Sequence, residues 1–126
     1  MNTLKANKII YWISTLLFVV PSGIIGIFEL FLGGPESTVQ GLVRLGYPLY
    51  LMKIIGFAKI AGAIVVLFNR APRLKEWAYA GFTIEFLGAA ASHFLAGDAK
   101  SIPAPLIILI FTMVSYFYWH KNSKAV

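Results

Sequence analysis

Two ionisable residues lie in the middle of long apolar stretches of this 126-residue chain. Lys59 falls inside the apolar block 48–68, and Glu85 falls inside the block 76–95. Counted from the adjoining ends of these two blocks, each residue is nine positions in, or roughly 13 Å along a helix at about 1.5 Å per residue. A lone charge at that depth of a bilayer costs at least about 2.5 kcal/mol. The equal depths therefore predict that Lys59 and Glu85 form a buried ion pair or share a proton.

Small residues accompany both charges. Gly81, Glu85, Gly88 and Ser92 follow one another at steps of four, three and four, and Lys59 has Gly56 and Gly62 on either side. Such spacing places the small residues on one face of a helix, where a second backbone can come close. Two interpretations stay open: an ion pair that holds the bundle together, or a site that handles a ligand or protons.

A second polar group is expected near the other membrane boundary. Glu29, Lys53 and His93 each lie close to that end of their apolar block, so they could line a shallow polar vestibule. Side chains so near an interface also reach water by themselves, which is the competing explanation. The chain has no Cys, and His93 has no second His at ligand spacing, so no metal site is predicted.

The elements that must position these residues are four apolar blocks. Hydrophobic residues make up 59% of the chain and charged residues 13%, with a mean hydropathy of +0.77. The blocks are long enough, or nearly so, to cross a hydrocarbon core as helices. We predict an all-α integral membrane four-helix bundle, a single domain over residues 1–126, with helices at about 9–32, 48–68, 76–95 and 103–119. The connection 33–47 is expected to be a long loop over the mouth of the bundle.

The cations lie between apolar blocks, so the net charge of +6 indicates how the chain is oriented in a membrane and does not indicate a nucleic-acid-binding surface. Four spans put both termini on one side of the membrane. Seven cations fall on that side and only Arg44 and Lys100 on the other, which predicts cytoplasmic termini. The seven are Lys5, Lys8, Arg70, Arg73, Lys75, Lys121 and Lys124.

Several segments resemble the DoxX-like family of small four-helix membrane proteins. They are Leu45-Gly46-Tyr47-Pro48, the run Gly56–Ala63, the run Leu74–Phe82, Glu85, Gly88-Ala89-Ala90 and Ser92-His93. The resemblance implies that Lys59, Glu85, Ser92 and His93 form a characteristic polar set, whereas Glu29 and Lys53 do not map onto the pattern. Relatives of this family are associated with a thiosulfate:quinone oxidoreductase subunit and with oxidative-stress complexes. Without Cys, thiol chemistry is not expected here.

The first functional hypothesis is an accessory protein of the bacterial inner membrane that binds a lipid or quinone between its helices. Its expected partners are membrane lipid, a second copy of the chain, or a subunit of a redox complex. The alternative is a proton-coupled transporter like the small four-helix multidrug exporters, which use a membrane-embedded Glu. Catalysis stays open, with His93 as a general base beside Glu29, although no nucleophile or metal set accompanies them.

Overall fold

The computed structural model describes residues 3–68 and 70–124, and all the regular structure there is helical. This confirms the all-α prediction. The helices are α1 (Thr3–Phe31), α2 (Glu36–Leu45), α3 (Tyr50–Phe68), α4 (Pro72–Leu95), the short 3-10 helix η1 (Ala99–Ser101) and α5 (Pro103–Lys124).

The described residues contain five α-helices, so the expected count of four is wrong. The additional helix, α2, occupies most of the connection 33–47 that was predicted to be a loop. It begins after Pro35 and ends at Gly46, whose φ of 84° lets the chain leave the helix while its N–H still bonds to the last turn. Its mixed polar and apolar sequence is typical of a helix that lies at a surface. Because it is not a long apolar block, it was not among the predicted helices.

Other helix boundaries also differ from the predicted ones. α1 begins at Thr3 instead of residue 9, α4 begins at Pro72 instead of residue 76, and α5 continues to Lys124. In each case polar or charged residues extend the helix beyond its apolar part. Proline at the first position of α4 and of α5 suits a helix start, because the missing N–H would have no helical partner there.

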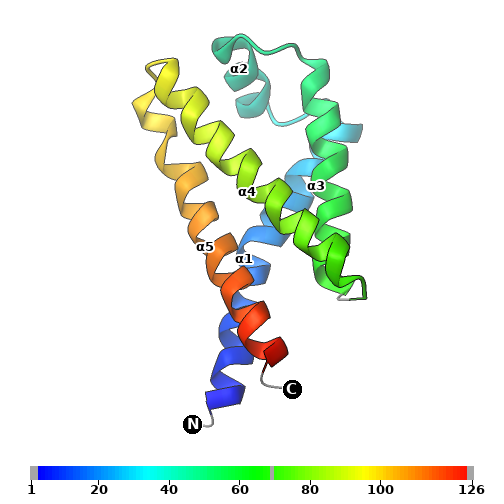
Figure 1. Cartoon of the computed structure of the whole chain (residues 1–126). Helices are drawn as coiled ribbons and strands as arrows, with labels where there is room; N and C mark the ends of the chain where they lie inside the picture. The colour runs from blue at the N-terminus through cyan, green and yellow to red at the C-terminus, as the bar shows by residue number, and fades with distance from the viewer. Residues whose placement is uncertain (1–2, 69, 125–126) are drawn as a thin grey trace.

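Each of the four long helices packs on two of the others, and α3 and α4 diverge along their length. α1 packs along α3 and α5, and α4 packs on the same two helices from the opposite side. Figure 1 shows α3 and α4 close together at the turn that joins them and far apart at their other ends, with α2 beside the wide opening. We call these the narrow end and the wide end. Both chain termini lie at the narrow end.

The buried core lies toward the narrow end. It joins Phe18 and Val19 of α1 to Val66 of α3 and to Tyr79 and Phe82 of α4. The Phe18 ring meets the Phe82 ring edge to face, with centroids 5.4 Å apart. Because this core ties three helices together near one end, the same helices are free to spread toward the other.

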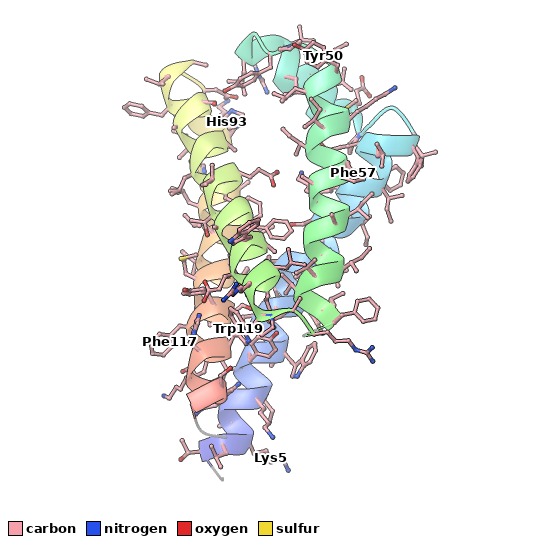
Figure 2. All side chains as sticks on the ribbon, turned by 45° about the vertical axis from the view of Figure 1, so that its right-hand side comes forward. Lys5, Tyr50, Phe57, His93, Phe117 and Trp119 are labelled. Carbon is pink, nitrogen blue, oxygen red and sulfur yellow. The ribbon has the colours of Figure 1, made fainter. Side chains whose placement is uncertain are left out.

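Much of the large apolar surface points outward. Phe57 on α3 is 63% exposed and Phe117 on α5 is 60% exposed, and both lie on the outside of the molecule in Figure 2. By length and composition α1, α3 and the segment Ala99–Ser123 could each cross a membrane. The fourth long helix, α4, has sufficient length but carries Arg73, Lys75, Glu76 and Glu85.

Candidate functional site

Three charged side chains from three helices meet around one amine. The Nζ atom of Lys59 on α3 donates to Oε1 of Glu29 on α1 over 2.9 Å. The same Nζ lies 3.1 Å from Oε1 of Glu85 on α4. We call Glu29, Lys59 and Glu85 the charge triad. The predicted contact between Lys59 and Glu85 is present, and the structure adds a second carboxylate to it.

The three side chains differ in how much they are covered. The Glu29 side chain is 3% exposed, that of Lys59 12% and that of Glu85 25%. Glu29 is thus enclosed between α1 and α3, whereas Glu85 lies at the edge of the cluster. The three groups carry two carboxylates for one ammonium, so the triad has an excess of one acidic group.

A groove between α3 and α4 leads to the triad. Its volume is about 380 Å³, and its walls are mostly apolar. Lys59 and Glu85 line it, whereas Glu29 does not. Besides those two, the walls include Ala58, Gly62, Val65, Trp77, Gly81 and Phe82. This volume falls in the range of small-molecule sites, which combine apolar walls with few polar groups.

Two glycines bring Glu29 and Lys59 together by letting α1 and α3 touch. A Cβ atom added at Gly56 would lie 2.8 Å from the carbonyl oxygen of Gly26 and 2.9 Å from Cβ of Glu29. A Cβ atom added at Gly26 would lie 2.9 Å from the Gly56 oxygen and 2.9 Å from Cβ of Lys59. Each glycine precedes a charged residue of its own helix by three positions, and each lies against the charged residue of the other helix. The close crossing therefore sets Glu29 opposite Lys59.

The small-residue stripe on α4 behaves differently from the expectation. Apart from the adjoining backbone of α4 itself, no heavy atom of the described residues comes within 4 Å of the position that a Cβ would take at Gly81 or Gly88. The prediction that another backbone packs closely there is wrong for Gly81 and Gly88 in this chain. The divergence of α3 and α4 leaves that face open, and Gly81 becomes part of the groove wall.

The predicted vestibule of Glu29, Lys53 and His93 is not assembled. Glu29 contacts Lys59, Lys53 is exposed on α3, and His93 contacts Asp98. The error came from the depth assigned to Glu29, which was counted from residue 9. α1 begins at Thr3, and Figure 1 shows that it starts well beyond the turn that joins α3 and α4 at the narrow end. Glu29 therefore lies at the level of Lys59, which it contacts.

Ser92 and His93 take part in contacts between α2 and α4 at the wide end. The Tyr47 hydroxyl lies 2.6 Å from Ser92 Oγ, just after α2 ends. Nδ1 of His93 lies 3.1 Å from Oδ2 of Asp98, and Nη2 of Arg44 on α2 lies 3.5 Å from the same oxygen. Figure 2 shows His93 near the end of α4 that faces the α2 region. These side chains join α2 to α4 across the wide end, and they do not reach the charge triad.

Asp98 is the acidic centre of this α2–α4 contact, and sequence reasoning missed it. A hydrogen bond from Ser101, the Arg44 guanidinium and His93 hold the pKa of Asp98 below its ordinary value. Asp98 follows Gly97 in a turn with a φ of 76° at the glycine. A turn residue carries no helical periodicity, so its partners could not be read from spacing.

A buried polar cluster occupies the narrow end. Lys75 of α4 is 1% exposed, and its Nζ donates to the Tyr11 hydroxyl of α1 over 2.6 Å. The same Nζ lies 4.8 Å from the ring centroid of Trp119 on α5. Nearby, the Ser115 hydroxyl lies 2.6 Å from the Tyr79 hydroxyl and 2.5 Å from Oγ1 of Thr15. These contacts join α1, α4 and α5, and burial leaves Lys75 no route to a ligand from outside.

The two polar clusters described above do not resemble a metal centre. Within the part of the chain that the structure describes, no group of three His, Cys, Asp or Glu side chains gathers as metal ligands would. The charge triad and its groove are therefore the candidate site: they join ionisable groups to an apolar space large enough for a ligand.

Comparison with known proteins places the chain in one family. No curated protein and no solved structure matches it. A sequence profile of the DoxX-like family matches residues 13–115, which include all three members of the charge triad. Taken with the apolar helices, this match shows that the chain is a small membrane protein that belongs to the DoxX-like family.

Proposed function

We propose that this chain is an accessory membrane protein that binds a lipophilic molecule in the groove between α3 and α4. The observation that carries the proposal is that Lys59 and Glu85, the accessible part of the charge triad, lie in the wall of an otherwise apolar groove. The ligand would place its apolar part against Val65 and Phe82. Its polar group would bond to Lys59 or Glu85.

A quinone fits this combination. Its carbonyl oxygens accept hydrogen bonds, which the ammonium of Lys59 donates, and its ring and tail suit apolar walls. A lipid chain with a polar head group shares the same chemistry. The family resemblance adds support for a role beside a redox complex of the bacterial inner membrane, with the termini on the cytoplasmic side as the distribution of cations predicts.

The test compares two glycines of α4. Gly81 lines the groove and Gly88 does not, and both have open space where a side chain would begin. Gly81→Leu should fill the groove, whereas Gly88→Leu should leave it free. The full chain would be purified in mild detergent, and native mass spectrometry would detect co-purified quinone or lipid and added decylubiquinone.

We expect bound quinone in the wild-type chain and in Gly88→Leu and its loss in Gly81→Leu. If lipid instead of quinone is bound at the same site, the groove is still the binding site and its ligand is lipid. A wild-type chain without any bound lipophile, or equal binding by the two variants, would rule the proposal out.

Proton-coupled transport remains the second candidate, favoured by the accessible carboxylate of Glu85. The two Glu residues of the triad share one Lys partner, so one of them can carry a proton without leaving the lysine unpaired. Proteoliposomes containing the chain would then show efflux driven by a pH gradient, and Glu85→Gln would abolish it. Efflux that persists in Glu85→Gln would exclude this mechanism.

A further inference from the structure

The excess acidic group in the charge triad calls for an explanation within the membrane. With all three groups ionised, the site would hold a net charge of minus one among apolar helices. A charge at such depth costs at least about 2.5 kcal/mol. A single proton on one of the carboxyl groups removes this charge and keeps the remaining carboxylate paired with Lys59.

The geometry distinguishes the two carboxyl groups. Glu29 makes the shorter contact with Lys59, 2.9 Å against 3.1 Å, and its side chain is 3% exposed. The Glu85 side chain is 25% exposed and lines the groove. A proton can reach Glu85 from the groove, whereas the surrounding helices cover Glu29.

Other ionisable groups around Glu85 are held elsewhere. On α4 itself and on the adjoining turn, His93 and Asp98 bond to each other, and Arg44 of α2 bonds to Asp98. From α3 only Lys59 faces it, and Glu29 of α1 reaches it through that lysine. The part of α5 between residues 103 and 115 has no ionisable side chain.

We infer that Glu85 is the proton-exchanging group of this site, while Glu29 is the permanent counter-ion of Lys59. In the empty groove Glu85 is a neutral carboxylic acid whose O–H can be donated to a ligand. When it releases that proton, the carboxylate competes with Glu29 for Lys59. Only the last step of this scheme, donation to a ligand, rests on the proposed function.

A hydrophobic carbodiimide tests the inference on the full chain in detergent or liposomes. Dicyclohexylcarbodiimide reacts with a protonated carboxyl group: the acid adds across a C=N bond to give an O-acylisourea, which rearranges to a stable N-acylurea. The product keeps all the atoms of both reactants, so mass spectrometry of peptides locates it. We expect the adduct on Glu85 at neutral pH and its absence from Glu29.

Two controls make the result specific. Glu36 is exposed on α2, outside the triad and its groove, and should stay unlabelled at neutral pH. In Glu29→Gln, Glu85 becomes the sole carboxylate partner of Lys59, so its labelling should fall by roughly tenfold or more. Labelling of wild-type Glu85 should also fall as the pH rises.

The inference is overturned if Glu85 is not labelled, if Glu29 is labelled in its place, or if Glu29→Gln leaves the rate at Glu85 unchanged. The wild-type pattern alone decides the first two outcomes, even if the variant fails to fold. Added decylubiquinone should slow labelling. If Glu85 is labelled equally with and without the quinone, quinone binding in the groove is wrong but proton exchange at Glu85 stands.

Discussion

Lys59 holds two carboxylates that come from two different helices, and this makes it the central residue of the site. Removing it leaves Glu29 and Glu85 close together without a cation. Removing Glu85 leaves Lys59 with its shorter contact, to Glu29. The two changes should therefore differ strongly in their effect on stability.

We expect Lys59→Met to lower the free energy of unfolding by about 3–5 kcal/mol, the usual loss when one partner of a buried ion pair is removed. Glu85→Gln should lower it by less, because Lys59 keeps a counter-ion. Unfolding in mixed detergent micelles would measure both. The triple variant Lys59→Met, Glu29→Gln, Glu85→Gln should regain most of the loss, and equal losses for the two single variants would contradict this account.

Counting along the sequence was enough to predict that Lys59 and Glu85 meet, since both are central in consecutive helices. It could not predict the partnership of Glu29. That contact depends on where α1 starts relative to the other helices, which is a property of packing and not of the apolar block itself. The spacing Gly26 to Glu29, matched by Gly56 to Lys59, was the available signal.

At the level of elements, the crossing of α1 and α3 depends on two glycines, whereas the exposed glycines of α4 are not packed. Gly56→Ala would push its new methyl group against the Gly26 oxygen and the Glu29 side chain. We expect it to lower stability by about 1–3 kcal/mol, as overpacking does. Gly88→Ala meets open space and should cause no loss. Thermal unfolding of both variants in one detergent would test the difference, and similar melting temperatures would argue against a tight crossing.

A second prediction at the level of elements concerns the contact that holds α2 to α4. Tyr47→Phe removes the hydroxyl that bonds to Ser92 and should free this end of α2. Tyr50 is 69% exposed and makes no side-chain hydrogen bond among the described residues, so Tyr50→Phe is the matched control. A lost hydrogen bond of about 1 kcal/mol corresponds to roughly fivefold faster amide exchange over residues 36–45. Exchange that is unchanged in Tyr47→Phe would show that other contacts hold α2.

At the level of the whole molecule, four long helices place both termini at one end, as the apolar blocks predicted. The divergence of α3 and α4 was not predictable in the same way. It results from a core gathered near Val66 and Tyr79 at one end and from an α2 region that is joined to α4 at the other end through Tyr47 and Asp98, which lie outside the helices. Apolar periodicity reports which segments are helical, but it does not report the angle between them.

Labelling would test the proposed orientation. The chain has no Cys, so single cysteines can be introduced without a background. Gln40→Cys on α2 and Ser123→Cys near the end of α5 are exposed positions at opposite ends of the molecule. In intact bacterial cells a membrane-impermeant maleimide should label Gln40→Cys alone, and Ser123→Cys should react only after lysis. The reverse pattern would overturn the orientation.

The burial of Lys75 relates the orientation of the chain in the membrane to the order in which its helices assemble. Lys75 is one of the seven cations on the terminal side, yet the finished bundle covers it almost completely. Positive charges influence orientation while a helix enters the membrane. Trp119, one of the residues that cover Lys75, belongs to α5, which follows α4 in the chain. During synthesis Lys75 therefore lacks the part of its cover that α5 supplies when α4 inserts, and the narrow end can close over it completely only after the last helix has arrived.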